Sequence, residues 1–357
     1  MKKTVLMLVA VLLLTGLFTA CGSEEPFAYN YDLSKYVELG NYEGVRASFK
    51  NSDEVTQEEM DEILYQIRLA HAVFNEEKDV AEKYDQVTVD LKVLCDGVSV
   101  EDAAQENYQV ILGLESVGDI ENALRPALVG KRVGDAVQAE ATLSADQNVY
   151  GDLAGKAVLL SATVKKIHAP DLPELDVDFV LSVTMGEFGD VATFVEDLRA
   201  STISYRWEEK QTKVLDAFME SCRVLQYPEK EINEYKKQYR TEIETQASLY
   251  GLTYDQYVTN YMKMTFQQVE EQYNQKARQQ VKADMVMLYL PRVMGTTLTE
   301  EEYQLLLQSY FEADGESVGV SSAEEYEKKF TRESLTKSFL WDKSFMEVLE
   351  NAVPVEE

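Results

Sequence analysis

Residues 86–93, Gln-Val-Thr-Val-Asp-Leu-Lys-Val, are the stretch at which the hydrophobic period of this chain changes. Apolar and polar side chains alternate strictly here, which is typical of a half-buried β-strand. Upstream, residues 56–74 have a helical period and open with a capping box formed by Thr56 and Glu59. The sequence therefore predicts a helix that leads into a β-rich region.

Further strand-like segments follow at residues 108–112, 136–143 and 157–167. Gly97, Gly130 and Gly134 mark turns between them, and a short helix is expected near residues 120–127. We therefore predict a compact β-rich domain at residues 81–168, preceded by a linker helix at residues 53–80.

After Pro170 and Pro173 the period is helical almost to the end of the chain. Pro228 stands at a position typical of a first helical turn, and Gly251 and Pro291 mark helix ends. Residues 169–357 are thus predicted to be all-α, and the fold class is α+β, a β-rich domain joined to a helical C-terminal domain.

The first residues of the chain are typical of a secretory signal. Lys2 and Lys3 precede an apolar run at residues 5–14, which is too short for a membrane span. The stretch Phe18-Thr19-Ala20-Cys21 resembles the lipobox of bacterial lipoproteins, which implies acylation of Cys21. Plain secretion, with cleavage after Ala20, is the alternative.

This reading predicts a signal peptide and lipobox at residues 1–21 and a tether at residues 22–52. The protein would be anchored by the lipid on Cys21 at the extracytoplasmic face of the bacterial cell membrane, because two acyl chains together hold a protein stably on a bilayer.

Composition limits the partners. The formal net charge is −30, from 34 Lys and Arg against 64 Asp and Glu, so a nucleic acid partner is excluded by repulsion. The only histidines are His71 and His168, and no His or Cys pair has metal-ligand spacing, so we expect neither a metal nor a cofactor. Cys95 and Cys222 could pair in an exported protein, and the sequence leaves this open.

Several segments carry a family resemblance. Residues 82–90, 128–135 and 150–156 resemble the peptidyl-prolyl isomerase domain of trigger factor, an FKBP-type immunophilin. Residues 164–179 are similar to that family's exit into its helical C-terminal domain, and residues 224–229 and 250–257 resemble its helices. The resemblance covers residues 53–305 and implies an FKBP-like domain followed by a trigger factor C-terminal chaperone domain.

Trigger factor also begins with a ribosome-docking domain, and nothing in residues 24–52 is long enough or basic enough to be one. The resemblance therefore implies a chaperone body that acts at the membrane without a ribosome. Its partners would be unfolded or newly exported polypeptides.

In this family the isomerase pocket is a small aromatic-lined bowl, whose apolar wall favours the twisted X-Pro amide. Tyr150 matches an aromatic of that pocket. The other positions that correspond to this pocket carry aliphatic side chains, namely Leu91, Val100, Val117, Ile120 and Leu160. These residues are the candidate catalytic site, and the alternative is that they only fill a core.

The helical region offers candidates for client binding, because tyrosine and methionine side chains adapt to many apolar segments. The candidates are Tyr235, Tyr239, Tyr254, Tyr257, Tyr261 and Met262. Packing of helix against helix is the alternative for most of them. Three functions remain open: an active prolyl isomerase, a holdase chaperone with a vestigial isomerase domain, and a lipoprotein adaptor for one specific partner.

Overall fold

The computed structural model describes residues 29–50, 54–114, 118–145 and 147–355. The chain divides into two compact units. Residues 53–204 form one, called here the β unit, and residues 1–52 with 205–357 form the other, called the helical unit. The division falls inside α5 (Val191–Ser221). The mixed α and β fold that the sequence predicts is confirmed.

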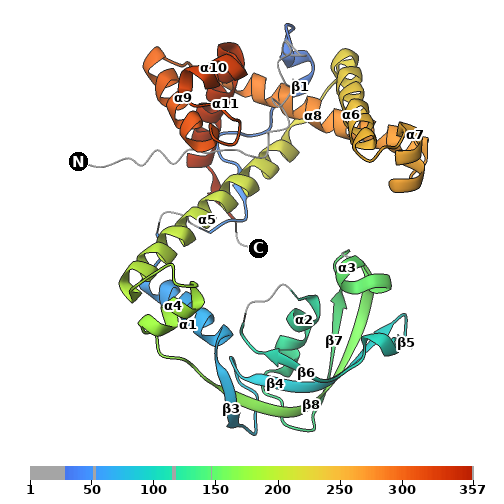
Figure 1. Ribbon diagram of the computed structural model, residues 1–357, viewed down its shortest axis with the longest axis vertical. Coiled ribbons are helices and arrows are strands. Elements are labelled where there is room, and N and C mark those ends of the chain that lie inside the picture. Colours follow the sequence, from blue (N-terminus) through green and yellow to red (C-terminus); the bar gives the residue numbers. More distant parts are fainter. Residues whose placement is uncertain (1–28, 51–53, 115–117, 146, 356–357) are drawn as a thin grey trace. The chain divides into compact units, whose positions relative to one another are not determined.

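The β unit is built on a curled antiparallel sheet (Figure 1). β4 pairs with β8, β6 and β5, while β8 also pairs with β7 and β3. The strands are β3 (Val73–Glu77), β4 (Gln86–Cys95), β5 (Val98–Ser99), β6 (Gln105–Ile111), β7 (Ala136–Thr142) and β8 (Ala157–Asp171). The three predicted strands after β4 are therefore confirmed as β6, β7 and β8.

The alternation in β4 has the expected physical origin. Val87, Val89, Leu91 and Val93 are at most 2% exposed and line one core. α2 (Asp119–Leu128) closes this core with Leu124 and Leu128 on the concave side of the sheet (Figure 1). Burial of one face of the strand by a helix thus accounts for its period of two.

The linker helix expected at residues 53–80 is shorter than that range. α1 (Gln57–Ala70) begins at the predicted capping box, in which the Thr56 hydroxyl accepts the Glu59 N–H and the Glu59 carboxylate accepts the Thr56 N–H. The helix ends at Ala70, and β3 follows because its backbone pairs with the last residues of β8. Two short helices complete the β unit, α3 (Gln147–Tyr150) and α4 (Val177–Val183).

In the helical unit, α8 (Phe266–Met294) packs against α6 (Glu229–Leu249) and α11 (Arg332–Glu350). α6 and α7 (Tyr254–Gln256) lie toward one end of α8, and α9 (Glu300–Asp314), α10 (Ala323–Phe330) and α11 gather toward the other (Figure 1). Between α7 and α8, Tyr257–Tyr261 form a π-helical turn. α8 ends at Gly295, whose φ of 68° suits a residue without a Cβ.

The predicted tether at residues 22–52 is wrong for the part that the structure describes. Residues 29–50, called here the strap, pack into the core of the helical unit through Tyr29, Leu33 and Val37, which are at most 3% exposed. β1 (Val37–Glu38) pairs with β9 (Arg223–Val224), and β2 (Arg46–Ala47) pairs with β10 (Val353–Pro354). Apolar contact with distant helices holds the strap, although it has no regular hydrophobic period of its own.

The predicted signal peptide and Cys21 lie outside the described residues. Among the helices that are described, none combines the length and hydropathy of a membrane span. Cys95 and Cys222 are both free thiols, half-buried and buried respectively. Within the described ranges, no three His, Cys, Asp or Glu side chains converge as metal ligands would.

Candidate functional site

Two tyrosines meet at the start of α2 in the β unit. Tyr150, at the end of α3, is half-buried against the sheet core, and its hydroxyl accepts the Asp119 N–H at 3.3 Å. Tyr108 of β6 is also half-buried, and its hydroxyl donates to the Glu121 carboxylate. Burial, followed by the Glu121 contact, raises the pKa of Tyr108, and burial raises the pKa of Tyr150. Both hydroxyls are therefore neutral hydrogen-bonding groups at physiological pH.

Ile120 of α2 packs beside these tyrosines on the same core. Tyr108 is absent from the residues that sequence reasoning selected, although its signal was present. It shares one face of β6 with Val110, which is fully buried, and a period of two places both side chains toward the core. The arrangement is a small, partly apolar surface with two phenols and no free nucleophile.

The other predicted isomerase residues do not join this surface. Leu91 and Leu160 are 2% and 0% exposed in the sheet core, so they offer no area to a substrate. This is the core-filling role that the sequence left open. Val100 is half-buried, and its N–H donates to the Val93 carbonyl at the β4–β5 hairpin. Val117 lies outside the described residues.

The helical unit exposes apolar side chains where α6, the π-helical turn and α8 meet. Leu249, Tyr250, Tyr261 and Phe266 are 75%, 57%, 54% and 48% exposed. We call these four residues the hairpin-end patch. Single exposed apolar residues are ordinary on protein surfaces, whereas a contiguous group marks an interaction site.

Ring contacts join the aromatic side chains of this region into two groups. Tyr257 stacks on Tyr261 with ring centroids 4.7 Å apart, and Tyr250 lies 5.2 Å from Tyr261. Tyr254 stacks on Phe266 at 6.2 Å. Tyr254 and Tyr257 are half-buried, and each contacts a more exposed ring.

The predicted client-binding residues divide into an exposed group and a buried group. Tyr261 is in the patch, and Tyr254, Tyr257 and Met262 are half-buried near it. Tyr235 is only 5% exposed and donates its hydroxyl to Asp284 at 2.7 Å, so it belongs to the core. Tyr239 is half-buried and stacks between Tyr235 and Tyr273. Core packing therefore accounts for these two tyrosines.

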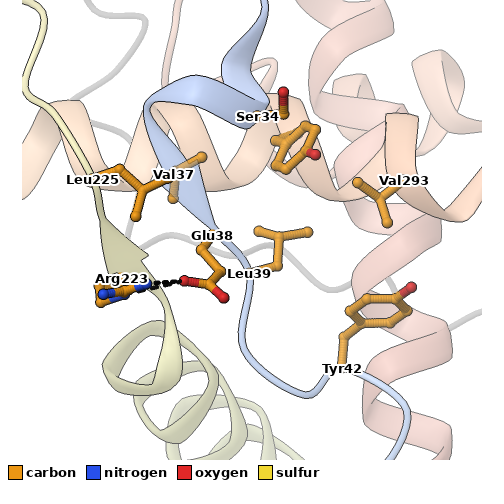
Figure 2. A pocket seen from close by; sticks show the side chains of 9 residues that line it. Ser34, Val37, Glu38, Leu39, Tyr42, Arg223, Leu225 and Val293 are labelled. Atoms are coloured by element: carbon orange, nitrogen blue, oxygen red, sulfur yellow. Dashed lines mark hydrogen bonds and ion pairs between the residues drawn. The ribbon is translucent and has the colours of Figure 1, made fainter.

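A groove of about 490 Å³ opens between the strap, β9 and α8. Figure 2 shows Leu39 and Tyr42 of the strap facing Val293 of α8 across it. At its rim, Arg223 donates to the Glu38 carboxylate at 2.6 Å and 3.1 Å. The groove is lined mainly by apolar side chains, and the strap forms one of its walls.

Comparison with known proteins shows what the helical unit is similar to. Residues 204–333, which include the hairpin-end patch, match the family described as "Bacterial trigger factor protein (TF) C-terminus". The chain is trigger factor-like. The trigger factor of Carboxydothermus hydrogenoformans is 27% identical over 343 residues, which cover 94% of this chain and 77% of the relative. The trigger factor of Lachnoclostridium phytofermentans is 27% identical over 287 residues, which cover 78% of this chain and 64% of the relative.

The trigger factor-like chain thus spans about three quarters of the first of these relatives and less than two thirds of the second. A solved structure described as "Promiscuous Substrate Recognition in Folding and Assembly Activities of the Trigger Factor Chaperone" aligns with 88% of this chain and 72% of its own. Sequence identity in that alignment is 20%, and the TM-score is 0.39.

Proposed function

We propose that this trigger factor-like chain is a membrane-anchored, extracytoplasmic folding factor that binds unfolded polypeptides at the hairpin-end patch. The observation that carries the proposal is a group of stacked aromatic side chains left exposed on a chain of net charge −30. The similarity of residues 204–333 to the trigger factor C-terminus supports it.

Apolar burial supplies the binding energy. An aromatic side chain buries about 150–250 Å² when fully covered, so each half-exposed ring of the patch has roughly 100 Å² left to bury. At about 25 cal/mol per Å², one ring contributes about 2.5 kcal/mol before the cost of ordering a client. Several such rings bind a flexible apolar segment without fixed complementarity, and the acidic surface keeps the patch soluble.

Anchoring through Cys21 remains part of the proposal. Tyr29, where the strap begins, follows Cys21 by eight positions. An extended chain of this length spans at most about 30 Å, so a lipid on Cys21 would keep the helical unit, and its patch, close to the membrane surface. Polypeptides that emerge from export would then be the clients, with neither ribosome nor nucleic acid as partner.

Prolyl isomerisation is the second candidate activity, in an FKBP-like β unit. Tyr108 and Tyr150, held at the start of α2, favour it because a twisted X-Pro amide needs an apolar wall and not an acid or base. A vestigial isomerase domain and an adaptor for one specific partner are the alternatives.

The test is suppression of aggregation of two unrelated unfolded proteins. We expect the combined substitution Tyr250→Ser, Tyr261→Ser and Phe266→Ser to weaken client affinity at least about tenfold. Tyr205→Ser is the matched control, because Tyr205 is 67% exposed on α5 and lies outside the patch. Equal suppression by the patch variant and the control would refute client binding at the patch, and binding to one protein alone would favour the adaptor.

Isomerase activity is tested separately on a short X-Pro peptide. Turnover above background that falls in Tyr150→Ala and Tyr108→Ala would make the β unit an enzyme. Turnover that neither substitution changes would exclude this surface as the catalytic site.

A further inference from the structure

Two buried carboxylates lie where the strap joins the helical unit. Asp284 of α8 is 6% exposed and Glu231 of α6 is 4% exposed. In the part of the chain that the structure describes, neither forms an ion pair with Lys or Arg. A buried carboxylate without a cation depends on hydrogen-bond donors for its stability.

The strap supplies one of the donors to Asp284. The Tyr29 hydroxyl donates to Asp284 Oδ2 at 2.7 Å. Tyr235 of α6 donates to the same oxygen at 2.7 Å, and Gln280 of α8 donates Nε2–H to Oδ1 at 3.1 Å. Asp284 therefore ties together the strap and two helices through a single side chain.

Tyr31 brings the strap to the second carboxylate. Its hydroxyl is buried close to the Glu231 carboxylate. Burial first, and then the neighbouring Glu231, raise the pKa of Tyr31. The centroid of the Tyr31 ring lies 5.9 Å from that of Tyr29 and 4.5 Å from that of Tyr36. The first two of these tyrosines are neighbours of the Asp284 and Glu231 carboxylates.

We propose that Tyr29 and Asp284 form a proton-sensitive fastening, which holds the strap on the helical unit in mild acid and loosens it as the pH rises toward neutrality. The inference does not depend on the proposed chaperone function. Its consequence concerns the groove of Figure 2, because strap residues form one wall of that groove. Loosening the strap would widen the groove and expose apolar surface.

The electrostatics support this direction. Burial raises the pKa of Asp284 from 3.8 to about 6, against the hydrogen bonds from Tyr235, Tyr29 and Gln280, which lower it. The groups that face Asp284 are Tyr29 and Tyr31 of the strap, Glu231, Tyr235 and Tyr239 of α6, and Gln280 of α8. Glu231 also raises the pKa of Asp284, and none of these groups is a cation.

Lifting of the strap lowers the affinity of Asp284 for its proton. When the strap lifts, water reaches Asp284 and its pKa falls toward the ordinary value of 3.8, so the lifted state binds the proton less tightly. Raising the pH through this window favours the lifted state. With these two pKa values the opening equilibrium increases about tenfold between about pH 5 and about pH 8, and it levels off above about pH 7.

Hydrogen exchange of residues 29–47 in the purified full chain tests the proposal, with uptake corrected for the intrinsic pH dependence of exchange. We expect strap opening to rise about tenfold from about pH 5 to about pH 8. Asp284→Asn should flatten this dependence, because the amide remains neutral. Asp342→Asn is the matched control, since Asp342 is another carboxylate with a raised pKa but contacts Tyr310 instead of the strap. Asp342→Asn should leave the pH dependence of strap opening unchanged.

Tyr29→Phe provides a second variant that keeps the carboxylate. We expect it to increase strap opening at every pH and to steepen the pH dependence, because ionised Asp284 then loses a donor. Strap opening that is equal at both pH values, or a wild-type slope in Asp284→Asn, would overturn the proposal. If Asp284→Asn does not fold, an unchanged exchange profile in Tyr29→Phe overturns it instead.

Discussion

Replacing Asp342 with Asn perturbs a carboxylate packed between two helices of the C-terminal cluster. Asp342 of α11 accepts a hydrogen bond from the Tyr310 hydroxyl of α9. It forms no ion pair among the described residues, and the neighbouring Lys343 pairs with Glu302. Burial, partly offset by the Tyr310 bond, raises the pKa of Asp342 from 3.8 to about 7.

Because the folded-state pKa of Asp342 lies above its unfolded value, the folded state binds the proton more tightly. The associated stability is fully present below about pH 4 and is lost as the pH rises through about 7. The difference between the unfolded and folded pKa values corresponds to about 4 kcal/mol. The side chain is partly exposed, so about 2 kcal/mol after solvent screening is the better expectation.

Asn has nearly the shape of Asp, remains neutral, and can still accept the Tyr310 bond. We therefore expect Asp342→Asn to raise the free energy of unfolding by about 2 kcal/mol at about pH 8 and to change it little at about pH 4. Urea denaturation at several pH values measures this, with fluorescence of Trp341, which is 2% exposed and stacks on Phe345. Asp216→Asn on exposed Asp216 of α5 is the control. A variant with the wild-type pH slope, or one less stable at high pH, would refute the reasoning.

Two further predictions concern stability and location. Phe339 is fully buried, and its ring centroid lies 5.3 Å from that of Tyr303 and 5.0 Å from that of Tyr310. Phe339→Ala should therefore lower the free energy of unfolding, measured in urea, by about 3–5 kcal/mol. Leu305→Ala is the control and should lower it by less than about 0.5 kcal/mol, because Leu305 is 60% exposed. A loss below about 1 kcal/mol at Phe339 would contradict the packing. Cys21→Ala should remove the chain from the membrane fraction in cell fractionation. Unchanged membrane association would rule out anchoring by a lipid on Cys21.

The spacing of apolar side chains predicted the helices and strands in which such side chains recur at regular intervals. The strand at residues 86–95 and the capping box at Thr56 appear in the structure as expected, because the alternation of apolar side chains and the spacing of Thr56 and Glu59 are both visible within a few residues of sequence. β3 was not predicted, since residues 73–77 become a strand only by pairing with the distant end of β8. Propensity carries no information about such a partner.

For the candidate sites too, the sequence and the tertiary structure supplied different information. The sequence selected the aromatic region around Tyr261 as a candidate, but it could not separate this exposed ring from Tyr235, which has the same residue type and lies on a helix of the same hairpin. Exposure at the end of the hairpin and the hydrogen bond to Asp284 are tertiary facts. Similarly, Tyr108 and Tyr150 are 42 positions apart in sequence, and only the fold brings them both to α2.

By itself, the sequence determined the charge, the signal-like N-terminus, the order of strand-rich and helical regions, and the resemblance to trigger factor. Tertiary structure decided that residues 29–50 are a packed strap, that Leu91 and Leu160 fill a core, and that Asp284 joins three segments of the chain. The physical reason is the separation in sequence over which each kind of interaction acts. Periodicity and capping act over a few residues, whereas burial and the pairing of a buried carboxylate depend on partners that are up to 255 positions away.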